Sequence, residues 1–204
     1  VVGAGERYSK ADIISAAGLN IGDNLFLTDS DDVERSIEKK LPYIIDAQLS
    51  KKFPSTFKLT VKETEPDRIY SVGKDMYALC KGEKVLEIID EYISSYTYYD
   101  IPVKKAKAGE NIAIDNEISE IYNELEKAIS ESKLNNITAI SFKNKVDIKL
   151  IFDNRLLLEI GTTENIKEKL ATASEVIDRV MSKHGSEVEG SINLKYLVDN
   201  NTET

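Results

Sequence analysis

The side chains that most often perform covalent chemistry are scarce in this chain. It has one cysteine, Cys80, and one histidine, His184. A nucleophile activated by an imidazole would need these two residues to converge from different elements. His184 precedes Gly185 at the end of a helical pattern, where an imidazolium interacts favourably with the helix dipole. Cys80 lies in an apolar strand pattern typical of a small buried side chain. We therefore predict structural roles for both.

Two groups of carboxylates could bind a metal ion or act as an acid–base pair. The run Asp29–Asp32 resembles the start of a calcium loop, but glycine is missing at its sixth position and glutamate at its twelfth. A helix start with acids in its first turn is the better interpretation. Glu63 and Glu65 could in principle serve a glycosidase; an exposed strand end is favoured. No glycine-rich phosphate loop or nucleophile elbow occurs in the sequence. We predict no catalytic residue, metal or cofactor.

A cluster of tyrosines could form a platform for sugar rings. Tyr92, Tyr96, Tyr98 and Tyr99 lie within eight residues. Tyrosines on a half-buried strand are the commoner explanation, because the ring is apolar while its hydroxyl still finds a partner. The segment from 92 to 102 is therefore predicted to be extended.

The composition limits the class of protein. The chain of 204 residues has 41% apolar residues and a formal net charge of −9, which is typical of a globular protein. This acidic balance argues against a protein that binds nucleic acid through its phosphates, and it disfavours electrostatic adhesion to anionic lipid. A single cysteine forms no internal disulfide. No apolar run approaches the roughly 18 residues of a membrane span. The chain opens at Val1 on what resembles a strand end, so we expect a piece of a longer protein, in which any membrane anchor would lie upstream.

The first third of the chain predicts a small βααββ unit. Val1–Gly3 reads as the end of a strand. A capping box at Ser9 and Asp12 predicts a helix that stops at Gly18. Thr28 or Asp29 is expected to cap a second helix, which ends before Pro42. Two alternating strands then follow, with their apolar positions at Ile45, Ala47 and Leu49 on one and at Phe57, Leu59 and Val61 on the other.

The remainder predicts a larger mixed domain. Short strands are expected at 69–72, 76–80 and 85–89. A helix follows over about 116–133, with Ile118, Ile121, Leu125 and Ile129 on its apolar stripe. A meander is expected from Ile137 to Ile160, with tight turns at Lys143-Asn144 and Asp153-Asn154. A last helix ends at His184, and a final strand runs from about Ser191 to Val198. We predict an α+β fold whose larger sheet is mainly antiparallel, with domains at 1–66 and 67–198 and a disordered tail at 199–204.

Motifs in the first domain resemble those of a POTRA domain. The loop Ala17–Phe26 reads AGLNIGDNLF, and it stands between the two expected helices. The segment Lys52–Pro66 reads KFPSTFKLTVKETEP, a basic-aromatic-proline start followed by alternating apolar residues and a Glu-x-x-Pro end. This string is similar to the one found in the FtsQ/DivIB family.

The second domain carries further motifs of the same family. Cys80–Leu86 stands where the family has a hairpin that usually begins with aspartate, so Cys80 departs from the pattern. Ile101-Pro102 followed by Gly109 is similar to another family segment, and so is the run from Leu156 through Lys169-Leu170. The similarity covers nearly the whole chain in order.

The resemblance implies a non-enzymatic division scaffold. A family member is a single-pass membrane protein with an upstream helix and an extracytoplasmic portion such as this one. Its partners are small bitopic division proteins of the FtsB/DivIC and FtsL type. The last strand is the expected docking edge, and its residues are Ile192, Asn193, Leu194, Lys195, Tyr196, Leu197 and Val198.

In that strand, Ile192, Leu194, Tyr196 and Val198 are expected to face the core, while Asn193, Lys195 and Leu197 face outward. An interior strand, or an edge guarded by Lys195, is the simpler interpretation. Two other functions stay open. One is a POTRA-containing chaperone of outer-membrane protein assembly, and the other is a cell-wall carbohydrate hydrolase.

Overall fold

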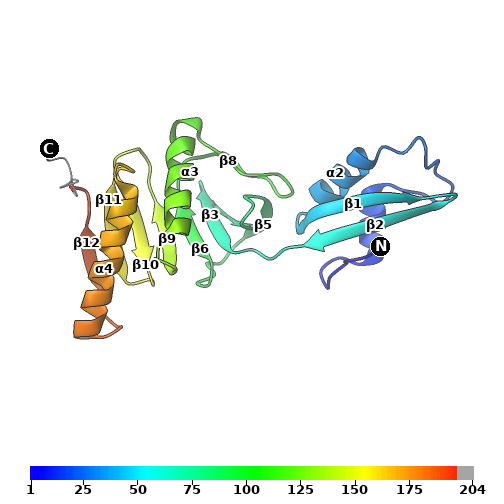
Figure 1. The fold of residues 1–204 in the computed structure, drawn as a ribbon. Helices are drawn as coiled ribbons and strands as arrows, with labels where there is room; N and C mark the ends of the chain where they lie inside the picture. Colours follow the sequence, from blue (N-terminus) through cyan, green and yellow to red (C-terminus); the bar gives the residue numbers. More distant parts are fainter. Residues whose placement is uncertain (197–204) are drawn as a thin grey trace, which may run out of the picture. The chain divides into compact units, whose positions relative to one another are not determined.

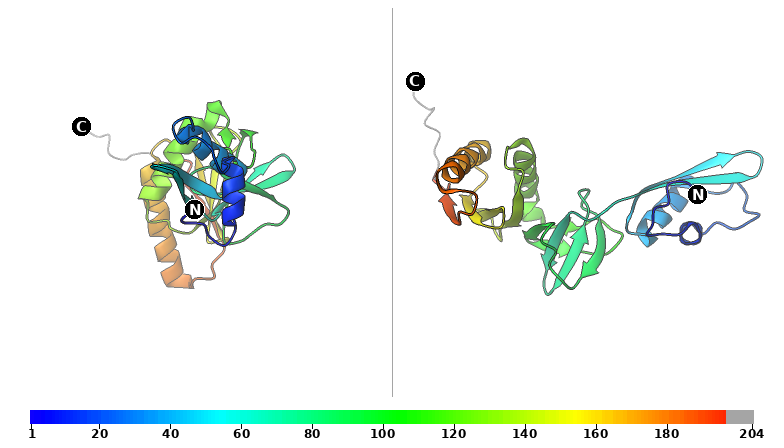
Figure 2. Two further views of the ribbon diagram at one scale, coloured as in Figure 1. Left: turned by 90° about the vertical axis from the view of Figure 1, so that its right-hand side faces the viewer. Right: turned by 90° about the horizontal axis from the view of Figure 1, so that it is seen from below.

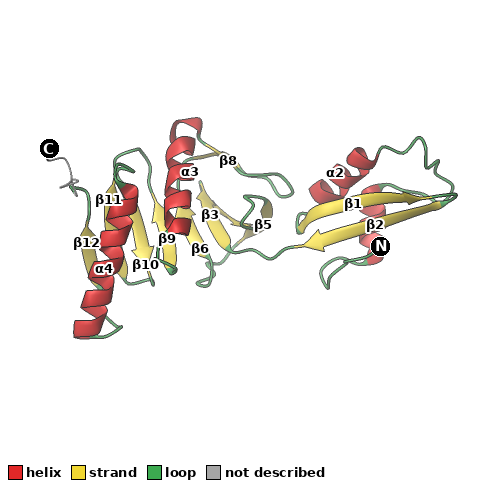
Figure 3. Cartoon of the chain, viewed as in Figure 1, coloured by secondary structure: helices red, strands yellow, loops and turns green. Residues whose placement is uncertain are grey.

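The computed structural model describes residues 1–196 of the chain. It forms two compact units. Among the described residues, unit 1 comprises 1–67, 77–89 and 106–112, and unit 2 comprises 68–76, 90–105 and the chain from 113 onward. The helices and strands of both are drawn in Figures 1 and 3. The fold is of the α+β class, as predicted. The predicted domain boundary at residue 66 lies inside unit 1, and we keep it as a proposal.

The two helices of unit 1 begin and end where local chemistry directs them. Helix α1 spans Lys10–Ala17, with Ser9 as its N-cap and Gly18 in the left-handed conformation after its last turn. The Ser9 side chain and the Asp12 carboxylate form the predicted capping box. Helix α2 spans Ser30–Lys40, and its N-cap is Asp29. The Asp29 carboxylate accepts hydrogen bonds from the backbone amides of Asp31 and Asp32. The acidic run is therefore a helix start.

The capping box predicts a pH response that is measurable at one residue. Hydrogen bonds from the Ser9 hydroxyl and then from its backbone amide lower the pKa of the Asp12 carboxyl below its ordinary 3.8. A depressed folded pKa means that this carboxylate stabilises the fold above its unfolded pKa, and that the contribution is lost as the pH falls through the folded value. In an NMR titration of side-chain carboxyls, Ser9→Ala should raise the pKa of Asp12. An unchanged midpoint would contradict the capping assignment.

The sheet of unit 1 has two strands, β1 (Ile44–Lys52) and β2 (Thr56–Glu63), which pair antiparallel. The predicted first strand is reduced to one parallel bridge between Val2 and Thr60. Helices α1 and α2 cover one face of this sheet (Figure 2). The prediction that Ile45 faces the core was wrong. A bulge between Ile44 and Asp46 turns Ile44 inward and leaves Ile45 37% exposed.

Unit 1 also contains a hairpin and a loop from later in the chain. Strand β5 spans Val85–Ile89, and β4 spans Asp75–Leu79 and is divided between the units after Met76. The ring of Tyr43 packs with Cys80 and Leu86. The Tyr43 hydroxyl donates to Glu87 Oε1 at 2.5 Å, and the Arg7 guanidinium lies 3.6 Å from the Tyr43 ring centre. These contacts hold the POTRA-like segment and the hairpin as one body.

Unit 2 is built on a mixed sheet in the order β12-β11-β10-β9-β6-β3. The strands of unit 2, including the small separate pair β7–β8, are β3 (Arg68–Val72), β6 (Thr97–Asp100), β7 (Val103–Lys105), β8 (Ala113–Ile114), β9 (Ile137–Ser141), β10 (Ile148–Phe152), β11 (Leu156–Gly161) and β12 (Gly190–Asn193). Strands β9, β10 and β11 form the predicted antiparallel meander. Asp153 and Asn154 both have positive φ between β10 and β11, as a type I′ turn requires.

Three pairings in this sheet are parallel and were not anticipated. They join β3 to β6, β6 to β9 and β11 to β12. Parallel strands need long crossover connections. Helix α3 (Asn116–Glu131) lies on the connection from β6 to β9, and helix α4 (Ile166–His184) joins β11 to β12. Both helices lie on the same face of the sheet (Figure 3).

Several predicted strand and helix details in unit 2 were wrong. Only Thr97–Asp100 of the tyrosine-rich segment forms a strand. Val146 precedes β10 and is 64% exposed. Helix α3 buries Tyr122 and Ala128 together with the predicted Ile118 and Leu125, whereas Ile121 and Ile129 are half-buried. The buried face is displaced because Tyr122 enters the core to contact other aromatic side chains.

Candidate partner-binding site

The predicted docking strand lies at the end of the sheet order. Among the described residues, β12 pairs with β11 alone, in parallel register from Leu156↔Gly190 to Glu159↔Asn193. The predicted bounds were wrong, because β12 ends at Asn193 and does not continue through Tyr196. A strand that is paired on one side keeps backbone hydrogen-bonding groups for another polypeptide.

Along β12, the backbone N–H and C=O groups of successive residues point alternately toward β11 and away from it. Gly190 N donates to Arg155 O at 3.4 Å, and Leu194 N donates to Glu159 O at 2.9 Å. In a parallel ladder, alternate residues of a strand bond to the same neighbour. Gly190, Ile192 and Leu194 therefore turn toward β11. The N–H and C=O groups of Ser191 and Asn193 point away from it. These two exposed residues define the docking edge.

The end of the docking edge is anchored by side chains. Leu194 is buried, at 2% exposure. The Lys195 ammonium lies 2.6 Å from Glu159 Oε2 on β11, and the hydrogen bond to Glu159 raises the pKa of Lys195. Asn193 Oδ1 accepts from Lys195 N at 3.1 Å, so the backbone N–H of Lys195 already has an acceptor. Lys195 thus fastens the strand to its neighbour, which was not its predicted role.

The other predicted docking residues have mixed outcomes. Ile192 is half-buried and Asn193 exposed, as expected. The prediction that Tyr196 faces the core was wrong: its side chain is 86% exposed, because the strand has ended and the chain turns before it. Leu197 and Val198 lie outside the described residues.

The equivalent edge in unit 1 is closed by carboxylates. Strand β1 has β2 on one side, and its other side faces away from the sheet. Ala47 N donates to Glu38 Oε1 at 3.0 Å, and Leu49 N donates to Glu34 Oε1 at 2.7 Å. Both carboxylates come from helix α2. Since the outward amides of β1 already have charged acceptors, strand addition there would have to displace them. Among the described residues, no such carboxylate bonds to the outward amides of β12, so this edge is the better candidate.

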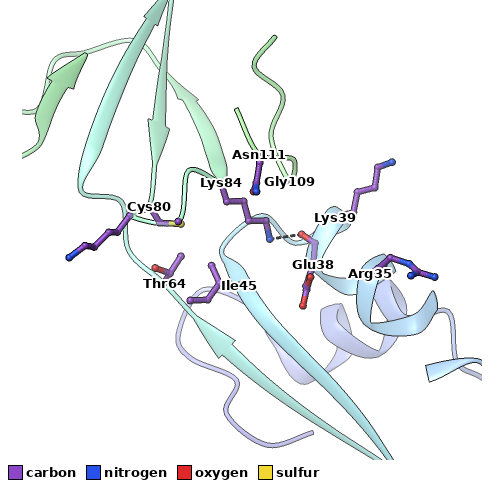
Figure 4. A pocket seen from close by; sticks show the side chains of 11 residues that line it. Arg35, Glu38, Lys39, Ile45, Thr64, Cys80, Lys84, Gly109 and Asn111 are labelled. Carbon is purple, nitrogen blue, oxygen red and sulfur yellow. Dashed lines mark hydrogen bonds between the residues drawn. The ribbon is translucent and has the colours of Figure 1, made fainter. Parts of the chain in front are cut away.

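A cavity of about 650 Å³ lies in unit 1 beside the end of helix α2 (Figure 4). The buried Lys84 ammonium donates to Glu38 O at 2.7 Å and to Ile44 O at 2.5 Å. Burial lowers the pKa of Lys84 despite the opposing effect of Glu38. Because the last carbonyls of a helix have no partner within it, Lys84 acts as a cap supplied from the hairpin. Sequence reasoning missed this residue, and only its apolar neighbours Val85 and Leu86 hinted at its burial.

Comparison with known proteins shows which proteins this chain is similar to. Residues 1–64 match the family described as "POTRA domain, FtsQ-type". Cell division protein DivIB of Clostridium botulinum (strain Hall) is 27% identical over 171 residues, which cover 82% of this chain and 66% of that protein. DivIB of Clostridium acetobutylicum is 26% identical, over 89% of this chain and 74% of its own length. Cell division protein FtsQ of Geobacter sp. (strain M21) is 32% identical over 38% of this chain and 28% of its own.

These matches support an FtsQ/DivIB family cell-division protein. The POTRA domain is therefore the FtsQ type, as its loop and strand motifs indicated. The chain spans slightly less than two thirds of the Clostridium botulinum relative, at 66% of its length. Among residues 1–196, no helix is both long and apolar enough to cross a bilayer.

The residues considered as catalytic or metal-binding candidates have structural surroundings. Cys80 is buried in unit 1, at 3% exposure. His184 is exposed in the last turn of α4, as predicted. Glu63 Oε1 accepts from Gly5 N at 2.9 Å. Across residues 1–196, no group of three or more His, Cys, Asp or Glu side chains is arranged to hold a metal ion.

The tyrosines divide between surface and core. Tyr92 is 49% exposed, whereas Tyr99 is buried and stacks on Tyr70 with ring centres 4.5 Å apart. The Tyr99 hydroxyl donates to Glu126 Oε1 at 2.8 Å. Burial, followed by the charge of Glu126, raises the pKa of Tyr99. Such a buried, hydrogen-bonded ring belongs to the core, so the four tyrosines do not form one platform.

Proposed function

We propose that this chain is the extracytoplasmic part of a membrane-anchored, non-enzymatic division scaffold. It binds small bitopic division proteins of the FtsB/DivIC and FtsL type by adding a partner strand to the docking edge of β12. The observation that carries this proposal is that, within residues 1–196, β12 pairs on one side alone, which leaves the backbone groups of Ser191 and Asn193 directed outward.

The relatives support the cellular context of this proposal. They are named as cell division proteins. The upstream membrane anchor is part of the proposal and follows from the resemblance to this family. The closed edge of β1 supports the choice of site, since its outward amides already bond to Glu34 and Glu38. The same comparisons give no support to an outer-membrane assembly chaperone. A carbohydrate hydrolase would need a pair of opposed carboxylates in a cleft, and we infer none at Glu63 and Glu65.

Amide hydrogen exchange resolved by residue tests the mechanism. The probe is the soluble extracytoplasmic segment of a DivIC-type partner from the same organism. On binding, the amides of Ser191 and Asn193 should slow markedly, because they gain acceptors from the new strand. Leu194 is the internal control, since its amide already bonds to Glu159 O.

Two results would refute the proposal in different ways. If the partner binds and protects other amides but leaves Ser191 and Asn193 unchanged, strand addition at β12 is wrong. If no division protein of this type binds the chain at all, the scaffold function itself is wrong.

A further inference from the structure

Four large apolar side chains project into solvent at one end of the POTRA domain. Ile21, Phe26 and Leu27 belong to the α1–α2 loop, and Phe53 belongs to the β1–β2 turn. Their exposed fractions are 108%, 79%, 83% and 63%. The rings of Phe26 and Phe53 lie 5.1 Å apart between centres, so the two loops present one surface. We name these four residues the apolar tip.

The apolar tip is held in place by the loops that carry it. Lys51 Nζ donates to Thr28 O at 2.6 Å and so ties the hairpin to the α1–α2 loop. Asn24 Oδ1 accepts from Phe26 N at 2.8 Å. The loop and the turn lie at the same end of the domain in both Figure 1 and Figure 2. Exposed apolar surface on an ordered support marks an interaction site more often than a defect of packing.

The start of the chain lies beside the middle of β2 and is directed, going upstream, toward the β1–β2 turn. Val2 pairs parallel with Thr60 of β2, so residues before Val2 run alongside the beginning of that strand. Val1 lines the same hollow as Ile21 and Phe57. A segment that precedes Val1 would therefore reach the POTRA domain from the side of the apolar tip.

We propose that the apolar tip inserts into the interfacial layer of a lipid bilayer. This inference rests on the proposed function, because the upstream anchor brings the bilayer to this end of the domain. Ile21 borders the hollow that Val1 lines, whereas Phe26, Leu27 and Phe53 are not part of its lining and project from the loops. Three projecting apolar side chains suit a fluid surface better than a folded partner. Apolar and aromatic residues that enter the headgroup region gain affinity from the apolar area they bury.

Apolar burial carries the interaction, because the charges around the tip are mixed. Lys52 and Lys58 on the hairpin are opposed by Asp29 and Asp31 at the start of α2. Binding is therefore expected on zwitterionic lipid, and it should persist at high salt. This also agrees with the acidic composition, which disfavours electrostatic adhesion to anionic lipid.

Tryptophan fluorescence tests the insertion directly, since the chain contains no tryptophan. Phe26→Trp and Phe53→Trp place a single reporter in the tip. Ile88→Trp is the matched control, because Ile88 is 59% exposed on β5 of the same unit. The chain is tethered by an N-terminal histidine tag to nickel-chelating lipid in phosphatidylcholine vesicles with brominated acyl chains. Both tip reporters should shift to the blue and be quenched, and the control should not change.

A partition measurement adds a second readout without the tether. Phe26→Ser should weaken association with phosphatidylcholine vesicles about tenfold, as expected when one aromatic side chain no longer enters the interface. Unquenched tip reporters in chains with native circular dichroism would overturn the proposal. Association that disappears at high salt would also overturn it, because apolar insertion is not screened.

The outcomes separate this inference from the proposed function. Partner-induced protection of Ser191 and Asn193 is measured on the Phe26→Ser chain. If that protection is kept while both tip reporters stay unquenched, only the lipid contact is wrong. If the tip reporters are quenched while no partner protects the docking edge, only the scaffold mechanism is wrong. A tip variant that loses partner protection without lipid present would show a protein-docking surface, and would likewise overturn the lipid proposal.

Discussion

Proline at both Ser191 and Asn193 should abolish most partner binding while leaving the fold intact. Each proline removes an outward N–H and places its ring where a partner carbonyl would approach. Each lost hydrogen bond contributes about 0.5–1.5 kcal/mol, so the double variant should bind roughly ten- to a hundredfold more weakly. Isothermal titration with the soluble partner segment measures this change. Thermal melts followed by circular dichroism check the fold.

The fold should survive because proline suits an extended edge. The inward bonds of Gly190 and Leu194 to β11 are untouched. Gly190 and Ile192 would precede the new prolines, and such residues prefer the extended conformation that they already have. The matched control is Ser191→Ala with Asn193→Ala, which keeps both outward amides. If that control loses as much affinity as the proline variant, side chains and not the backbone carry the interaction, and strand addition is contradicted.

Lys84→Met should destabilise unit 1 by about 2 kcal/mol. The substitution keeps the length of the side chain but leaves Glu38 O and Ile44 O without their buried donor. An unsatisfied buried polar group costs about 1–3 kcal/mol. Removing a desolvated ammonium offsets part of this loss. Urea unfolding of the variant, followed by far-ultraviolet circular dichroism, should therefore show a lower midpoint than wild type.

The control for this prediction is a neighbouring lysine. Lys81→Met removes the same charge from the same turn, but Lys81 is exposed, so its effect should stay within about 0.5 kcal/mol. Amide exchange in the 106–112 loop should also accelerate in Lys84→Met, since that loop packs against α2: a Cβ on Gly109 would meet Lys39 O at 2.2 Å. Equal midpoints for Lys81→Met and Lys84→Met would show that Lys84 is not a cap.

Features set by neighbouring residues were predictable from the sequence. The capping box at Ser9 and Asp12, the left-handed stop at Gly18 and the turn at Asp153-Asn154 each depend on backbone groups a few residues away. Their energetics are the same whatever the rest of the chain does. The alternating strands of the meander follow from a period of two residues that one buried face imposes.

Features set by distant residues were not predictable in this way. The bulge at Ile44 shifted the register and put Ile45 outside, although the apolar alternation included it. The apolar alternation predicted that Tyr196 faces the core, yet strand β12 ends at Asn193. The next two residues, Leu194 and Lys195, bond to Glu159 of β11, and the chain turns after them. The amides of β1 are capped by carboxylates from α2, and no local pattern indicates this.

The sequence by itself indicated the family resemblance, the four helices, the antiparallel meander and a last strand that begins near residue 191. Only the tertiary structure decided that this strand pairs in parallel with β11, that its outward backbone belongs to Ser191 and Asn193, and that Lys84 caps a helix more than forty residues earlier. The physical reason is range. Local hydrogen bonds and side-chain periodicity depend on residues close together in the sequence. The docking edge of β12, the Lys84 cap and the apolar tip depend on which distant segments come into contact when the chain folds.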